Sequence, residues 1–168
     1  AVNALVSVGD ELYIGRNPLL QAVEGFANLD RARLVNIQEN SEMLTVNGFN
    51  LLDEITDDVY ISNNLNLKAI GGFNALRRVG DDVLIERNNS LVSVGSSFEN
   101  LRYLSDSGQG LDRLYLRYND ALCSDEATAF ANRMGVPSNR RDLRDNRGQP
   151  DACGLCGGDA IDESECGD

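Results

Sequence analysis

The sequence predicts a mainly β protein with little helix, a parallel solenoid of about five coils that ends in a short C-terminal capping helix. The first observation is a strand motif that recurs as LYIGRN, VNIQEN, VYISNN, VLIERN and LYLRYN. The second is its spacing, because the final asparagines of these copies are 23, 24, 24 and 31 residues apart. The third is a column of phenylalanines after the motif, which contains four of the five Phe residues in the chain.

Each copy of the motif predicts a short β-strand. Apolar side chains alternate along it, so Leu12 and Ile14 point to one face of the strand while Tyr13 points to the other. A coil of 23 or 24 residues leaves no room for a long helix on its return side. Successive strands should therefore stack in parallel, about 4.8 Å apart, with their apolar faces inside.

Two columns of the repeat are expected inside the solenoid. The amide of each motif asparagine can satisfy backbone groups that the corner after the strand leaves free, which favours a structural role over ligand binding. The asparagines expected to act in this way are Asn17, Asn40, Asn64 and Asn88. The phenylalanine column, equally inward, contains Phe26, Phe49, Phe73 and Phe98.

Three regions are expected along the chain. Residues 1–122 form the solenoid, whose N-terminal coil is incomplete because NALVSVGDELYI aligns with the middle of a repeat, NALRRVGDDVLI. Residues 123–153 form a helical cap, and residues 154–168 form an acidic Cys-rich tail or linker. The extra residues of the last repeat, in the region 105–112, have the composition of a surface loop.

The cap is predicted from a change of pattern after the last repeat. Ser124 or Asp125 can cap a helix, and Gly135 followed by Pro137 ends it. A short amphipathic helix of this kind covers the exposed end of a solenoid core. The polar, Arg-rich segment 139–150 that follows is expected to return along the surface.

The repeat resembles the leucine-rich repeat superfamily, whose signature is LxxLxLxxNxL or a near variant. The V-x-G-F-x-x-L-x-x-V tract is similar to the receptor L-domain type within it, although Ala32 and Ser97 depart from the pattern. This resemblance implies a right-handed solenoid that binds a protein or glycan through its strand face. The last 18 residues look like the CGxCGGD repeats of some extracellular proteins.

All four cysteines follow the solenoid: Cys123, Cys153, Cys156 and Cys166. Counting alone allows three pairings. The resemblance to disulfide-capped repeat domains implies a Cys123–Cys153 bond, which leaves Cys156 to pair with Cys166. A zinc site at Cys153 and Cys156 is the alternative, but no second Cys or His pair completes it. Disulfides predict a secreted or cell-surface location.

The amino-acid composition argues against several classes of partner and of catalytic site. The chain has 27 acidic against 15 basic residues, a formal charge of −12, and no histidine. Repulsion argues against nucleic acid and anionic membranes as partners, and the missing histidines remove most catalytic triads and metallohydrolase centres. No apolar run suits direct membrane insertion. We expect a monomeric, non-catalytic module of a larger protein, since the chain also lacks an initiating Met.

Residues that the repeat does not dictate are the candidates for binding. They point outward from the strands, and tyrosine and arginine are frequent among them, as at many recognition surfaces. Exposed tyrosines also stabilise strands, and this alternative stays open. The candidate ligand-binding face consists of Tyr13, Arg16, Gln38, Tyr60, Asn63, Leu84, Arg87, Tyr115, Arg117 and Tyr118.

Acidic pairs precede two neighbouring strands. Asp57 and Asp58 should stack on Asp81 and Asp82 within about 5 Å, where like charges repel unless water, arginine or a cation intervenes. These four carboxylates are candidate calcium ligands. The alternative is a solvated turn that is rich in Asp for turn chemistry. No other cofactor is expected.

The leading hypothesis is an extracellular recognition or adhesion module that binds a protein or glycan through its strand face. The alternative is a structural spacer of a larger surface or matrix protein, with or without stabilisation by calcium. An enzyme is the weakest hypothesis, because it would need paired carboxylates in a cleft and a solenoid offers a broad sheet instead.

Overall fold

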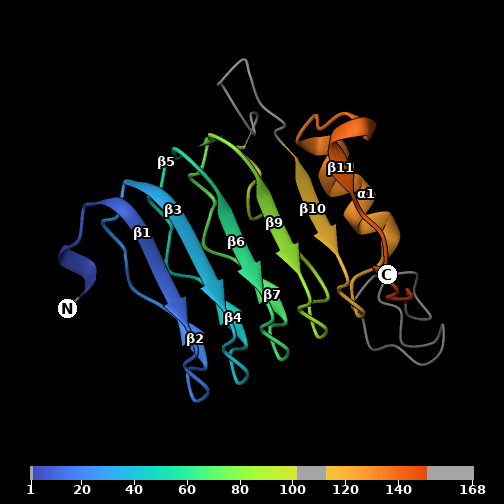
Figure 1. Ribbon diagram of the computed structural model, residues 1–168, viewed down its shortest axis with the longest axis horizontal. Helices are drawn as coiled ribbons and strands as arrows, with labels where there is room; N and C mark the ends of the chain where they lie inside the picture. Colours follow the sequence, from blue (N-terminus) through green and yellow to red (C-terminus); the bar gives the residue numbers. More distant parts are fainter. Residues whose placement is uncertain (1, 102–112, 151–168) are drawn as a thin grey trace, which may run out of the picture.

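A computed structural model describes residues 2–101 and 113–150. Over these residues the chain is mainly β, and its parallel strands form a β-solenoid of about 5 turns. An α-helix lies at the C-terminal end of the stacked strands, as Figure 1 shows. The predicted fold class is therefore confirmed at the level of a parallel solenoid with a C-terminal helix. None of the helices in the described ranges has the length and apolar content that crossing a membrane requires.

The main wall of the solenoid is a parallel sheet that we call the strand face. From the second motif strand onward, neighbouring strands pair without a shift, so that Val59 lies beside Val35 on one side and beside Val83 on the other. The first two motif strands pair with one register shift, between Val8 and Glu11. Its motif strands are β1 (Ser7–Gly15), β3 (Arg31–Gln38), β6 (Val59–Ser62), β9 (Val83–Glu86) and β10 (Leu114–Arg117). Two short strands, β5 (Glu54–Ile55) and β8 (Arg78–Val79), continue the first part of β3 into the next coils.

The return side is built from much shorter elements. β2 (Ala22–Val23), β4 (Thr45–Val46) and β7 (Ala69–Ile70) form a three-stranded parallel sheet behind the strand face. A 3₁₀ turn, η1 (Val2–Ala4), precedes the first coil. Within residues 2–101, the return side of the coils therefore contains no α-helix, as the coil length predicts.

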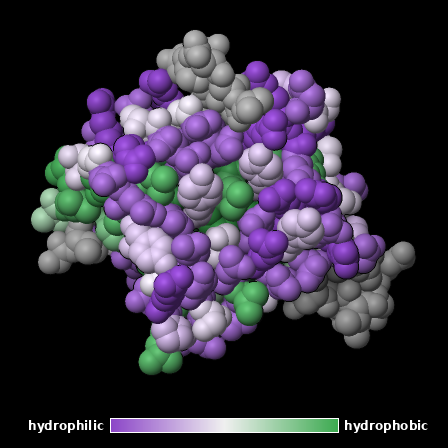
Figure 2. All heavy atoms as spheres, in the orientation of Figure 1, coloured by the Kyte–Doolittle hydropathy of each residue, from purple (hydrophilic) through white to green (hydrophobic). Residues whose placement is uncertain are grey.

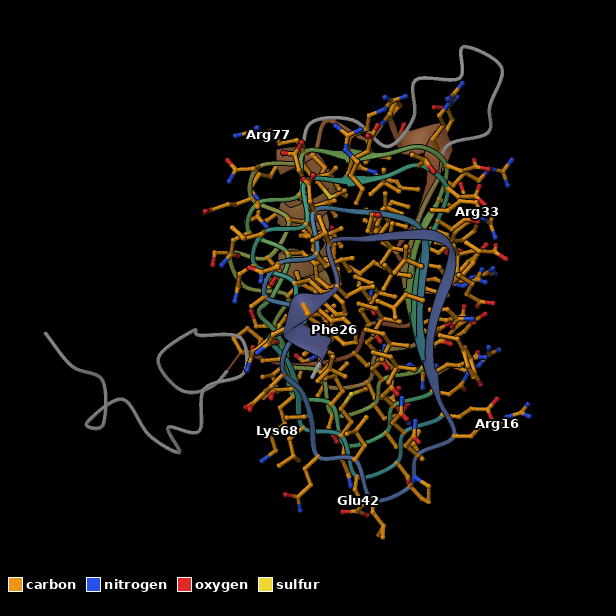
Figure 3. All side chains as sticks on the ribbon, turned by 90° about the vertical axis from the view of Figure 1, so that its left-hand side faces the viewer. Arg16, Phe26, Arg33, Glu42, Lys68 and Arg77 are labelled. Carbon is orange, nitrogen blue, oxygen red and sulfur yellow. The ribbon has the colours of Figure 1, made fainter. Side chains whose placement is uncertain are left out.

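The core lies between these two walls, and Figure 3 shows Phe26 pointing into it while Arg16 and Arg33 lie on the strand-face side. The phenylalanines form the predicted stack: the ring centroids of Phe26 and Phe49 are 5.2 Å apart, those of Phe49 and Phe73 5.0 Å, and those of Phe73 and Phe98 4.9 Å. Phe130 of the C-terminal helix meets the last ring edge-on at 5.9 Å. The helix thus closes the core with the same kind of side chain.

The asparagine ladder is also confirmed for Asn40, Asn64 and Asn88, which are fully buried. Asn17 bonds to Asn40 but is exposed, because no coil covers it on its N-terminal side. Asn64 is fully buried, and its Nδ2 donates to the Ile37 carbonyl at 3.0 Å and to Asn88 Oδ1 at 3.3 Å. Asn88 Oδ1 also accepts the backbone N–H of Asn64 at 3.1 Å. Each rung therefore ties one coil to the next and satisfies backbone groups that would otherwise be buried without partners.

Every ladder asparagine follows a residue in the left-handed region of backbone space. The residues with this conformation in the five motifs are Arg16, Glu39, Asn63, Arg87 and Tyr118, with φ between 55° and 59°. This conformation is unfavourable for residues other than glycine. The same backbone conformation recurs at five corners with different side chains before the asparagine. We infer that the hydrogen bonds of the ladder, and not that side chain, determine it.

The segment 139–150 differs from the expected surface return. β11 (Arg141–Asp142) adds a strand to the sheet beside β10, and Asn146 is buried as a sixth rung of the ladder. Leu143 packs against the core and Asp145 has φ of 57°, so RDLRDN follows the course of LYLRYN. The motif is hard to recognise in the sequence because Arg141 replaces its first aliphatic residue.

The capping helix α1 spans Ser124–Arg133, and its N-cap residue is Cys123. The cap therefore lies one residue before Ser124, the earlier of the two residues expected in that position. Gly135 with φ of 74° follows the helix, and a 3₁₀ turn, η2 (Ser138–Arg140), leads into β11. Cys123 is buried. Cys153, Cys156 and Cys166 lie outside the described residues, as do the tail 154–168 and the 105–112 loop, so the disulfide pairing stays a prediction.

Candidate functional site

The predicted ligand-binding residues lie in rows across the strand face. Strand register places Tyr60 beside Leu84 and Leu84 beside Tyr115, and it places Tyr13 beside Asn36 on the first two strands. Figure 2 shows that this side of the molecule is mostly hydrophilic with small apolar areas between. The face therefore offers scattered aromatic and aliphatic contacts in polar surroundings, as recognition surfaces do.

The N-terminal part of the face is open and loosely connected. Tyr13 is 43% exposed, and its hydroxyl accepts a long hydrogen bond of 3.5 Å from Gln38 Nε2. Arg16 Nε pairs with Glu39 at 2.9 Å, but both side chains are largely exposed. Exposed pairs of this kind contribute little to stability. Tyr13 and Arg16 are therefore accessible to a partner.

Tyr60, in the middle of the face, is half-buried. Burial raises the pKa of its phenol, and a hydrogen bond with Asp58 and the negative charges of Asp58, Asp82 and Asp57 act in the same direction. The neutral phenol is therefore its stable form. Its neighbour Leu84 is also half-buried. The side chain of Asn63 donates a 3.4 Å hydrogen bond to Ser62, and its backbone N–H donates to the Glu86 carbonyl at 3.2 Å.

Arginines surround the aromatic rings at the C-terminal end of the face. The guanidinium of Arg117 lies 4.9 Å from the ring centroid of Tyr115 and 5.5 Å from that of Tyr118. Arg87 and Arg144 also lie over the Tyr118 ring, at 5.4 Å and 5.7 Å. Four predicted site residues, Arg87, Tyr115, Arg117 and Tyr118, are thus brought into one cluster.

An ion-pair network anchors this cluster. Arg117 pairs with Glu86 at 2.8 Å and with Asp142 at 2.7 Å, and Asp142 also pairs with Arg144 at 2.9 Å. Burial works against the charged form of Asp142, but hydrogen bonds from the Arg117 side chain and the Arg144 backbone, with the charges of both, lower its pKa overall. Arg117 is therefore held rigidly against Tyr115.

A pocket of about 340 Å³ opens beside this network, between β10 and the segment that carries β11. Its walls contain five arginines: Arg113, Arg117, Arg140, Arg141 and Arg144. The remaining lining residues are Tyr115, Asn139 and Asp142. The sequence-based list contained only Tyr115 and Arg117 of this set. The residues of the β11 segment were missed because this segment was not recognised as a sixth copy of the motif, and Arg113 was missed because it lies just before the β10 motif.

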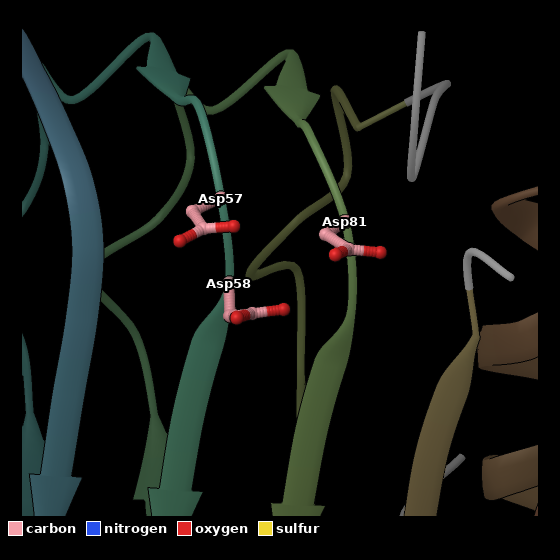
Figure 4. Close-up of side chains that lie close together, drawn as sticks. All are labelled: Asp57, Asp58 and Asp81. Atoms are coloured by element: carbon pink, nitrogen blue, oxygen red, sulfur yellow. The ribbon is translucent and has the colours of Figure 1, made fainter. Parts of the chain in front are cut away.

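The candidate calcium ligands are only partly brought together. Carboxylate oxygens of Asp57, Asp58 and Asp81 lie within 4.8 Å of one another, and Figure 4 shows these residues just before β6 and β9. Arg33 already donates to Asp57, and Asp58 Oδ1 accepts the backbone N–H of Asp82 at 2.9 Å. The cluster could hold a cation, yet protein donors already satisfy the carboxylates of Asp57 and Asp58.

Asp82 is not part of that cluster. Its Oδ1 accepts the backbone N–H of Arg113 at 2.7 Å, across to the next coil. Burial raises its pKa to about 6, and the charges of Asp81 and Asp58 add to the rise, whereas the hydrogen bond from Arg113 opposes it. This carboxylate supports the chain at the entrance of β10 rather than a metal site.

The fold and this surface define a parallel β-solenoid with an open strand face and an arginine-lined pocket at its C-terminal end. The sequence matches no protein-family model, and neither a similar curated protein nor a similar solved structure was found.

Proposed function

We propose that this chain is a non-catalytic recognition or adhesion module that binds an extracellular protein or glycan through its strand face. The observation that supports the proposal most strongly is that inward side chains of each strand form the core, whereas the outward ones are available to a partner. On β10, Leu114 and Leu116 are fully buried, whereas Tyr115 and Arg117 stand on the outside in a preformed cluster. Rigid Tyr and Arg side chains are the residues that most often dominate binding energy.

The shape of the surface supports binding over catalysis. The described outward residues spread over five parallel strands, and a broad sheet contacts a large partner better than it encloses a small substrate. The proposed location is the cell surface or the secreted fraction. That part of the proposal depends on the predicted disulfides and on the resemblance to receptor L-domains.

A pair of matched double variants tests the proposal. Tyr60→Ser with Tyr115→Ser removes two aromatic contacts from the strand face. Leu51→Ser with Leu65→Ser removes exposed apolar side chains, 56% and 51% accessible, that lie outside the motif strands. Attachment of the purified chain to cells and to extracellular matrix is measured for both, together with their melting temperatures.

Recognition through the strand face predicts that the tyrosine variant loses attachment while it remains folded at the assay temperature, and that the leucine variant attaches like the wild type. Equal attachment of all three proteins contradicts it. That result favours the second candidate function, a structural spacer. The continuous asparagine and phenylalanine ladders favour such a spacer, because they tie every coil to the next along the solenoid axis.

A further inference from the structure

The arginine-lined pocket at the end of the strand face is positively charged, although the protein as a whole is negatively charged. The chain has a formal charge of −12, yet the pocket walls contain five arginines and a single carboxylate, that of Asp142. Asp142 is itself engaged by Arg117 and Arg144. A concentration of positive charge in a concave site attracts anions even on an acidic protein.

Two of these arginines form no ion pair with a described carboxylate, although the charge of Asp82 acts on Arg113 from a greater distance. Arg113 Nη1 donates to the neutral hydroxyl of Tyr115 at 3.3 Å, and Arg141 Nη1 donates to the neutral amide of Asn132 at 2.7 Å. The structure gives neither an ion pair with a described acid within 4.0 Å. The Nε of Arg113 is buried without any acceptor among the described residues. Leaving a buried donor unsatisfied is costly, so Arg113 is held beside the pocket with one of its N–H groups unpaired.

Tyr115 gives the pocket a second kind of contact. Its ring lies between Arg113, which donates to its hydroxyl, and Arg117, which lies 4.9 Å from the ring centroid. The ring is thereby fixed, and it offers a flat amphipathic surface beside the guanidinium groups. A sugar that carries an acidic group matches both features, because its ring can pack on the tyrosine while its carboxylate or sulfate accepts from arginine.

The size and surroundings of the pocket limit the length of the ligand. About 340 Å³ is at the lower end of the range for small-molecule sites, enough for a short part of a glycan. Acidic residues such as Asp57, Asp58 and Asp81 lie elsewhere on the same face. They would repel a long polyanion that ran along the strands.

We propose that this pocket binds the acidic sugar of a short or terminal glycan segment, with Arg113 and Arg144 contacting its carboxylate or sulfate and Tyr115 packing on its ring. This inference rests on the proposed recognition function and names the ligand class for one end of the strand face. The shared chemistry is an anionic group on a sugar. A uronate and a sulfated sugar are separate arms of the test.

The experiment is isothermal titration calorimetry on the full chain with four probes: maltotriose sulfate, which carries no carboxylate, trigalacturonate, neutral maltotriose and hexaglutamate. The variants are Arg113→Gln and Arg144→Gln. Arg144 is an exposed residue, so its variant keeps the test valid if loss of Arg113 disturbs folding. Arg16→Gln is the matched control, since it removes an exposed arginine at the opposite end of the face. Circular dichroism confirms that each variant is folded.

The proposal predicts that at least one acidic oligosaccharide binds, that maltotriose and hexaglutamate do not, and that each pocket variant weakens binding about tenfold or more while the control leaves it unchanged. Which acidic oligosaccharide binds assigns sulfate or carboxylate as the recognised group.

Equal affinity for hexaglutamate overturns the assignment to a sugar, and binding that survives both pocket substitutions overturns the assignment to this pocket. If no acidic oligosaccharide binds while the wild-type chain still attaches to cells or matrix, this inference fails and the proposed function stands.

Discussion

Asn146 Oδ1 accepts hydrogen bonds from both the backbone N–H and the side-chain Nδ2 of Asn119, at 3.3 Å and 3.2 Å. The Nδ2 of Asn146 in turn donates to the Leu116 carbonyl at 2.6 Å. The cap therefore continues the asparagine ladder of the repeats instead of merely covering their end. It also positions β11, which supplies one wall of the arginine-lined pocket.

Replacing Asn146 by Ala should lower the free energy of unfolding by about 1 to 3 kcal/mol, because buried groups on Asn119 and Leu116 lose their partners. Urea denaturation measures the change. Asn50→Ala is the control, since Asn50 is exposed and makes one local hydrogen bond. Equal costs for the two substitutions would show that the sixth rung contributes no more than a surface residue.

Phe73→Ala should cost about 3 to 5 kcal/mol, because this fully buried ring stacks between Phe49 and Phe98 and a cavity would remain. Phe73→Leu should cost clearly less, since it keeps most of the apolar volume. Denaturant midpoints and slopes for both variants provide the comparison. A loss below about 1 kcal/mol for the alanine variant would contradict a packed phenylalanine column.

The raised pKa of Asp82 predicts a pH dependence. Its pKa changes from 3.8 to about 6 on folding, so the native state holds a proton that the unfolded chain releases between these values. The resulting stabilisation is fully present below the lower value and is lost as pH rises through about 6. Asp82→Asn keeps an oxygen for the Arg113 N–H and does not titrate.

Melting temperatures at about pH 5 and about pH 7.5 test this prediction. The wild type should lose more stability than Asp82→Asn over that interval. All other carboxylates are common to the two proteins, so the difference between them isolates residue 82. Equal slopes, or a steeper loss in the variant, would rule out the proposed protonation.

Calcium should leave the melting temperature of the wild type unchanged, because Arg33 and the Asp82 backbone N–H already satisfy two carboxylates of the acidic cluster. In Arg33→Gln the positive charge beside Asp57 is gone, and millimolar calcium should then raise the melting temperature. Differential scanning fluorimetry with calcium and with EDTA compares the two proteins. A rise in the wild type would instead support a calcium-stabilised spacer.

The sequence was sufficient to predict the solenoid because its interior repeats residue by residue. Asn64 and Phe73 can be assigned inward from spacing alone, since every coil places the same side chain type at the same corner. The inward and outward alternation of Tyr60 and Ile61 follows from the two-residue period of a strand. These predictions depended on the regular spacing of the repeat, and not on the strand propensity of any one residue.

The pocket could not be predicted because it depends on a degenerate repeat. Leu143 and Asn146 alone retain the motif of the cap strand, and Arg141 stands where an aliphatic residue would have identified it. Because the pairing of β11 with β10 was not predicted, nothing in the sequence indicated that the arginines of segment 139–150 lie near Tyr115. The contact of Asp82 with Arg113 could not be predicted for a similar reason, because this bond spans 31 residues across the long insertion.

The comparison of Tyr115→Ser with Leu116→Ser tests most directly whether inward columns build the fold and outward residues are free for recognition. These neighbours point to opposite sides of β10, with Leu116 fully buried. By urea denaturation, Leu116→Ser should cost about 3 kcal/mol or more, whereas Tyr115→Ser should cost about 1 kcal/mol, the scale of its contact with Arg117. Equal losses would mean that the tyrosines are structural, and would contradict the account.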